Sequence, residues 1–274
     1  MKTISLIAAD SIRGLLHQRL LLGLMLACLG LTVFFSIALA KTRKNITSSF
    51  SDGKGGANMS TVTNRMSETE QRQFRESMEN ASSMMQAFFY QVASFGGSLV
   101  ALFIFGTAVS SEIRRGTIRL TLSKPVSRTQ FLLGKYLGGV AVMAGYAVIA
   151  TLAILVFAQS EKVDLSPAMN WAPWLMFCRQ LMLGSVAMLL SLFFHPIIAA
   201  VLAFAAGNGL CSTSNPLYYI LPSYQDFNVF FQVFQGTLMH LHDVVMLSLY
   251  ALDFVVIMLM LALWRFHRKE LVSP

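Results

Sequence analysis

The sequence predicts an all-α polytopic membrane protein with six transmembrane helices in a single domain, residues 1–274. Hydrophobic residues make up 55% of the chain and charged residues only 12%, whereas a soluble domain carries about 25% charged residues. The mean hydropathy is +0.61. Apolar runs of about 20 residues are typical of membrane-spanning helices, because a backbone in lipid must satisfy its own hydrogen bonds. Six such runs lie at about residues 20–40, 92–111, 137–158, 174–194, 197–214 and 244–264.

Residues 1–19 form an amphipathic segment ahead of the first span. Their apolar side chains lie on roughly one helical face, with Lys2, Asp10 and Arg13 elsewhere. This pattern predicts a helix that lies in the membrane interface. We expect span one, residues 20–40, to be a transmembrane helix and not a signal peptide, because its apolar run is longer than a signal-peptide core and no small-residue cleavage site follows it.

The loop between spans one and two, residues 41–91, has two parts. Residues 45–66 are rich in Ser, Thr, Asn and Gly, which is typical of a mobile loop. Ser67-Glu68-Thr69-Glu70 then matches a capping box. We predict one continuous helix from about residue 68 into span two, projecting about 35 Å from the membrane. We expect the apolar side of this helix, at residues 67–91, to pack against an extracytoplasmic protein, another subunit or the loop itself.

A strongly basic segment, which we call the cassette (residues 112–136), joins spans two and three. Gly116 and Pro125 are expected to interrupt helical structure, and Thr117 can cap a short helix between them. Ser127-Arg128-Thr129-Gln130 matches a second capping box, which would open the helix of span three. The pattern predicts a short helix along the membrane surface, with an ordinary basic loop as the alternative. The residues expected to form this surface are Glu112, Arg114, Arg115, Gly116, Thr117, Arg119, Lys124, Pro125 and Arg128.

Glu112 is the only acidic residue of the cassette. We expect it to hold the cassette in shape, either by an ion pair with the neighbouring Arg114, Arg115 or Arg119 or by accepting hydrogen bonds from the backbone of the short helix. The alternative is an exposed surface carboxylate, which contributes about 0–1 kcal/mol.

Residues 207–243 are irregular but apolar. Gly207, Gly209, Pro216 and Pro222 interrupt helical structure, yet the segment contains no Lys or Arg. It is too apolar to lie free in water, and its uninterrupted pieces are too short to cross a bilayer. We therefore predict broken or re-entrant helices over 215–243 that are packed against protein, with a loosely packed surface loop as the alternative.

Basic residues concentrate on one side of the predicted spans. Residues 1–19, 112–136, 195–196 and 265–274 together hold twelve Lys and Arg against three Asp and Glu. By the positive-inside rule these segments face the cytoplasm, which places both termini there. The net charge of +8 then reflects topology, and because no basic–aromatic platform occurs we expect no nucleic-acid partner.

Two ionisable residues fall inside predicted spans. Asp253 lies near the middle of span six, and Arg179 lies in span four. Such residues usually face a bundle interior or a cavity, so Asp253 is expected to make a structural hydrogen bond, with Arg179 or a hydroxyl as partner, or to contact a substrate or proton. His240, His242 and Asp243 cluster at the start of span six, but no further ligand is evident and we expect no metal there.

The cassette reads Glu112…Arg115-Gly116-Thr117…Ser123-Lys124-Pro125…Arg128…Leu133-Gly134-Lys135, and span six ends in the basic exit Trp264-Arg265-Phe266-His267-Arg268-Lys269-Glu270. With the six-span plan and the interfacial lead-in helix, these features resemble the permease subunits of type-2 ATP-binding-cassette (ABC) transporters. The resemblance implies that the cassette is a coupling helix that docks on a separate cytoplasmic ABC ATPase subunit. It also implies pairing with a second permease copy, as a homodimer or heterodimer, and a bacterial inner-membrane location. The long loop at 41–91 departs from many members of that family.

The expected function is that of a multi-pass export permease surrounded by membrane lipid. No phosphate-binding G-x-x-x-x-G-K-[ST] loop occurs in the sequence, so ATP and Mg are expected on the partner ATPase, with no cofactor on this non-catalytic chain. One alternative is a secondary transporter or channel, which would require several intramembrane ionisable residues and inverted repeats. An intramembrane enzyme would require a nucleophile–base pair or metal ligands within the spans. A membrane anchor that transmits mechanical work to an extracytoplasmic partner is the remaining alternative.

Overall fold

The computed structural model describes residues 68–110, 112, 127–160, 165–208, 224–235 and 237–268, together with the isolated positions 7–9, 12, 23, 30 and 41. The elements are all helical, which agrees with the predicted all-α class. They are α4 (Glu68–Ala108), α7 (Arg128–Ser160), the 3-10 helix η1 (Pro167–Asn170), α8 (Ala172–Ser191), α9 (Pro196–Asn208), α10 (Phe230–Gln235) and α11 (Leu241–Arg268).

Four of these helices are long and apolar enough to cross a membrane. They are Ser83–Ala108 within α4, Arg128–Val156 within α7, the whole of α8 and the whole of α11, and they correspond to predicted spans two, three, four and six. The described part of span five is the 13-residue helix α9. Span one and the interfacial segment 1–19 lie outside the described residues, apart from isolated positions.

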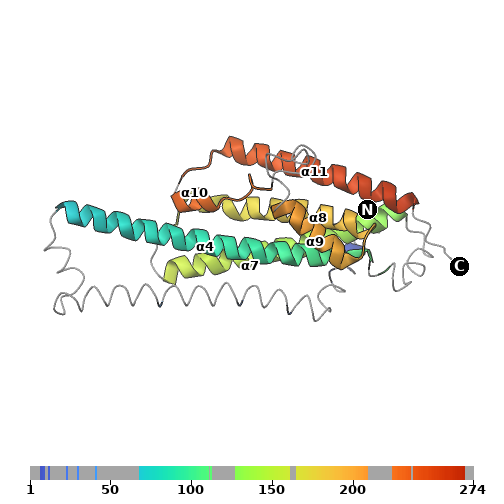
Figure 1. Ribbon diagram of the computed structural model, residues 1–274, viewed down its shortest axis with the longest axis horizontal. Helices are drawn as coiled ribbons and strands as arrows, with labels where there is room; N and C mark the ends of the chain where they lie inside the picture. Colours follow the sequence, from blue (N-terminus) through green and yellow to red (C-terminus); the bar gives the residue numbers. More distant parts are fainter. Residues whose placement is uncertain are drawn as a thin grey trace.

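The long helix predicted from about residue 68 is present as the 41-residue α4. One end of α4 extends well beyond the other helices (Figure 1). The stretch of α4 that is apolar enough to cross a membrane covers Ser83–Ala108, whereas the predicted span covers residues 92–111. Two polar side chains of this stretch, Gln86 and Ser94, are buried. Residues 68–82 therefore remain outside the span, which is about 22 Å of helix.

The helices α4, α8 and α11 run toward the same end of the bundle, and α7 and α9 run back from it (Figure 1). We call this the cassette end, because α4 stops and α7 starts there. The turn between α8 and α9 is short, and Pro196 opens α9, a position where its missing N–H is not needed. Near the opposite end the indole N–H of Trp174 donates to Ser248 Oγ at 2.8 Å, which aligns α8 with α11.

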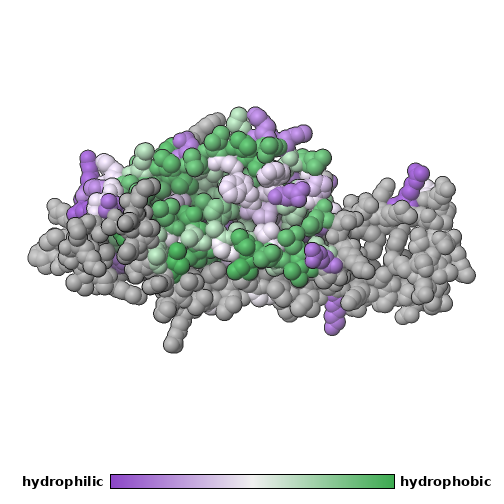
Figure 2. All heavy atoms as spheres, turned by 180° about the vertical axis from the view of Figure 1, so that it is seen from behind, coloured by the Kyte–Doolittle hydropathy of each residue, from purple (hydrophilic) through white to green (hydrophobic). Residues whose placement is uncertain are grey.

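The core lies between α4 and α8. Of their most apolar windows 67% and 72% are buried, against 33% for α7 and 22% for α11. Hydrophobic residues gather over the central part of the face shown in Figure 2. Small residues permit the close packing inside the core, as is usual between membrane helices. A Cβ at Gly97 would collide with the Gln180 amide and the Tyr146 ring.

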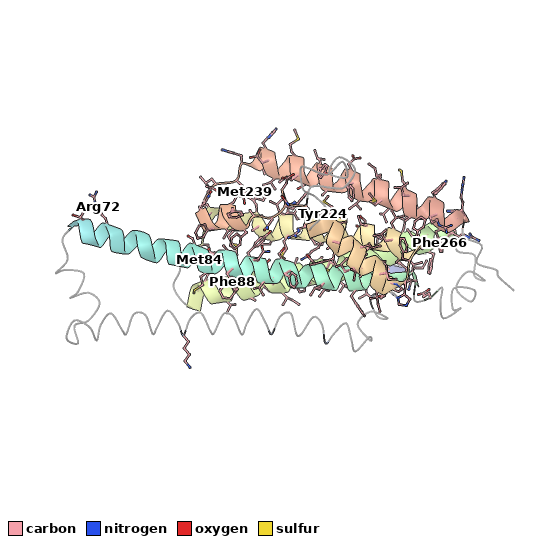
Figure 3. The ribbon with its side chains drawn as sticks, viewed as in Figure 1. Arg72, Met84, Phe88, Tyr224, Met239 and Phe266 are labelled. Carbon is pink, nitrogen blue, oxygen red and sulfur yellow. The ribbon has the colours of Figure 1, made fainter. Side chains whose placement is uncertain are left out.

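The described part of the predicted re-entrant region, residues 224–235, packs against α4. Tyr224, Phe227 and Val233 are almost completely buried, and the Tyr90 hydroxyl donates to the backbone carbonyl of Phe227 at 3.3 Å. Figure 3 shows Tyr224 among the helices of the bundle. These contacts agree with a segment packed on protein and not with a loosely packed loop. Residues 209–223 lie outside the described residues.

Candidate functional site at the cassette end

The interior of the cassette lies outside the described residues. This applies to Arg114, Arg115, Gly116, Thr117, Arg119, Lys124 and Pro125. The structure does describe the residues that border it, Glu112 on one side and Ser127–Lys135 on the other. We call these bordering residues, with their contacts on α11, the cassette frame.

The start of α7 carries the predicted capping box. The Ser127 backbone N–H donates to Gln130 Oε1 at 3.3 Å, and the Gln130 backbone N–H donates to Ser127 Oγ at 3.2 Å. These reciprocal bonds satisfy donors that a helix start leaves open. They fix the start of α7, which begins at Arg128 within the cassette.

An ion pair connects the two sides of the cassette frame. Glu112, just beyond the last turn of α4, pairs with the Lys135 ammonium group on α7. The two side chains are only 23% and 13% exposed, so water screens the pair less than it would a surface pair. The Lys135 ammonium group also lies 5.8 Å from the centre of the Phe131 ring. Glu112 thus has an ion-pair partner on α7, beyond the interior of the cassette. Pairing with Arg114, Arg115 or Arg119 stays a prediction, because these residues lie outside the described part of the chain.

Arg128 connects the cassette frame to α11. Its Nη1 donates to the backbone carbonyls of Phe266 at 3.3 Å and His267 at 3.0 Å. These carbonyls belong to the last turn of α11, where helical partners are missing and a cation is favoured. The rings of Phe131 and Phe266 stack beside this contact at 6.1 Å, and Phe266 lies at the cassette end of α11 (Figure 3).

Two further contacts extend the frame to the remaining helices. The Arg265 guanidinium lies 4.9 Å from the centre of the Phe193 ring, which joins α11 to the turn between α8 and α9. The Phe105 ring of α4 fills the space above Gly139 of α7 and Gly184 of α8, where a Cβ would collide with it. These contacts connect α4, α7, α8 and α11 to one another near the cassette end, and through the turn at Phe193 they reach the start of α9.

Replacing Arg128 by Met should loosen the last turn of α11. The substitution removes a charged donor from two carbonyls, an interaction worth about 1.5–3 kcal/mol. Hydrogen exchange read by mass spectrometry on the protein in nanodiscs should show faster exchange over residues 263–268. Arg268→Met is the matched control, because the Arg268 guanidinium lies over the Trp264 ring of its own helix, at 4.3 Å. Equal exchange in the two variants would contradict the capping role of Arg128.

Arg179 and Asp253 are not brought together. Arg179 is 8% exposed and donates to Ser94 Oγ on α4 at 3.1 Å, with the hydroxyls of Tyr90 and Tyr224 also near enough to interact electrostatically. Asp253 is exposed on α11. Within the described residues Arg179 is therefore not the partner of Asp253, because α11 turns its other face toward the bundle. A hydrogen bond to a hydroxyl of another span and a contact with a substrate or proton stay predictions. His242 Nδ1 lies 3.6 Å from Asp243 Oδ1, and both side chains are exposed.

Sequence reasoning overlooked Lys135 as the partner of Glu112, the bond from Arg128 to α11 and the Phe105 wedge. The sequence gives a weak signal for the Glu112–Lys135 pair, because one acidic and one basic residue flank the interior of the cassette. It gives no signal for the bond from Arg128 to α11 or for the packing of Phe105, because these contacts join segments far apart in the chain.

A family model described as "ABC-2 family transporter protein" matches residues 7–206. The match covers most of the chain, including α4, the cassette, α7, α8 and nearly all of α9. No curated protein matches the chain.

Proposed function

This chain belongs to the ABC-2 family of transporter proteins, and we propose that it is the permease subunit of an ATP-driven exporter. It would work with a separate cytoplasmic ABC ATPase and a second permease copy. ATP and Mg would bind to the ATPase, and this chain would couple their use to translocating or extracting a substrate.

The observation that carries the proposal is the closed cassette frame. A segment that receives a push from a soluble motor must be joined stiffly to the helices that it moves. Here the Glu112–Lys135 ion pair bridges the two sides of the cassette, and Arg128 links the cassette to α11. A displacement of the cassette would therefore tilt α4, α7 and α11 together. Such a movement is a rigid-body switch between two packings.

The proposed location is the bacterial cytoplasmic membrane, with both termini and the cassette end on the cytoplasmic side. The excess of Lys and Arg in the cassette and after α11 supports this orientation.

The projecting part of α4 would then lie outside the cytoplasm. Thr69 and Arg72 are exposed near its free end, and Met84 and Phe88 are exposed where it meets the membrane (Figure 3). This supports an extracytoplasmic protein at residues 67–91 as a further partner. The ATPase could in that case drive mechanical work on this partner.

The test is retention of an ATPase by the tagged chain purified from its native membranes. We expect an ABC ATPase to copurify with the chain. Stimulation of its ATP hydrolysis should be lost when residues 113–124 are replaced by a Gly/Ser linker of equal length. A matched linker at residues 52–63, in the long loop, should leave ATPase retention and activity unchanged. Transport by the chain alone without nucleotide would refute the proposal.

A further inference from the structure

The helix α11 is the least covered of the membrane helices in the described residues. Only 22% of its most apolar window is buried within the chain. Its inward side, with Val244, Ala251, Ala262 and Phe266, packs on the core. We call the opposite side the outer face of α11, which consists of Val245, Met246, Leu249, Tyr250, Leu252, Asp253, Val256, Ile257, Met260, Leu261 and Trp264.

The outer face extends from Val245 to Trp264, about 28 Å along the helix axis, which is close to the thickness of the hydrocarbon core. It is largely apolar along this length, with the Tyr250 hydroxyl and the Trp264 indole N–H as polar groups, and Asp253 near its middle is its only acidic residue. Within the described residues Asp253 makes no hydrogen bond or ion pair.

A carboxylate at this depth cannot simply face lipid. Charged groups at the bilayer centre are costly, and they almost always face protein or a water-filled cavity. The Asp side chain is too short to reach the headgroups from the middle of α11. The outer face is therefore expected to meet a water-filled cavity or a protein cover, and a protein cover would contribute a polar or charged group at the same depth.

A second copy of this chain is a poor complement for that carboxylate. Among the predicted spans, Arg179 is the only Lys or Arg. It is buried and bonded to Ser94 inside its own bundle. Two-fold pairing through the outer face would instead bring two Asp253 carboxylates together, because such an interface places the same patch on both sides.

We propose that the outer face of α11 binds a transmembrane helix of a different polypeptide, which places a Lys, Arg or His opposite Asp253. A long, convex, apolar strip with one central charge fits a helix that lies along it. The opposite charge in that helix would form an ion pair with the Asp253 carboxylate inside the bilayer. This partner would be additional to the ATPase and to the second permease copy.

The test uses dicyclohexylcarbodiimide, which modifies protonated carboxyl groups in apolar surroundings and is read at Asp253 by mass spectrometry. Two samples are compared, native membranes and the full chain made by cell-free synthesis in nanodiscs, where no other membrane chain is present. We expect labelling to be at least about tenfold lower in native membranes, because a nearby opposite charge favours the ionised carboxylate by about that factor or more.

Each other outcome overturns the proposal. Equal, strong labelling in both samples means that Asp253 faces lipid. Protection in both means that this chain or a second copy covers the outer face or that Asp253 lies in a water-filled cavity, and stronger labelling in native membranes excludes a cationic partner. Asp253→Asn controls for the site of modification, and the exposed Asp243 at the start of α11 should stay unlabelled throughout. Because the readout is independent of ATP hydrolysis, its failure leaves the permease proposal standing.

Discussion

Replacing Glu112 by Ala is expected to leave the protein in the membrane but to reduce substrate-stimulated ATP hydrolysis and transport about tenfold or more. The substitution removes the ion pair with Lys135 that bridges the two sides of the cassette. A hydrogen bond to a charged group contributes about 1.5–3 kcal/mol, and about 1.4 kcal/mol corresponds to a factor of ten in an equilibrium. The measurement compares basal and substrate-stimulated ATPase activity of the assembled complex in proteoliposomes.

Lys135 and Asp243 provide the controls for this prediction. Lys135→Met should reproduce the loss, and the exchanged pair Glu112→Lys with Lys135→Glu should restore part of the coupling. The coupling energy of the pair then follows from a double-mutant cycle. Asp243→Ala, at an exposed acid of the opposite end, should leave coupling unchanged. Full coupling in Glu112→Ala would show that the pair has no part in transmission.

Replacing Gly184 by Ala is expected to give the largest loss of stability. Its new Cβ would collide with the Phe105 ring, and at Gly139 the nearest atom of the same ring would be 2.6 Å from a Cβ. The ring is fully buried between α7 and α8 and has little room to move. Overpacking of this kind typically costs about 1–3 kcal/mol. Thermal unfolding in detergent should show a clearly lower midpoint.

Gly145→Ala is the matched control for the glycine prediction, because nothing lies within 4 Å of a Cβ at that position of α7. It should be neutral or slightly stabilising, since Ala favours a helix. Replacing the Phe105 ring by the smaller Leu side chain should restore part of the stability of the Gly184→Ala protein. A Gly184→Ala protein as stable as the Gly145→Ala protein would show that Phe105 is not wedged between the helices.

The local features of the fold were predictable because their causes are local. The capping box at Ser127 depends on residues within one helical turn, and the continuity of α4 depends on the absence of Pro and Gly before Gly96. The burial of Gln86 and Ser94, by contrast, depends on neighbouring helices and could not be predicted from local hydropathy.

By itself, therefore, the sequence determined the membrane-helical class, the cassette between spans two and three and the long projecting helix. These follow from run length, turn chemistry and charge, which act over a few neighbouring residues. Only the tertiary structure decided that Glu112 pairs with Lys135 and that Arg128 caps α11. It also decided that the Phe105 ring packs between α7 and α8 and that Asp253 faces away from its own bundle. The side of a helix that meets its neighbours depends on how all the helices rotate to pack, and an almost uniformly apolar span carries little of that information along the chain.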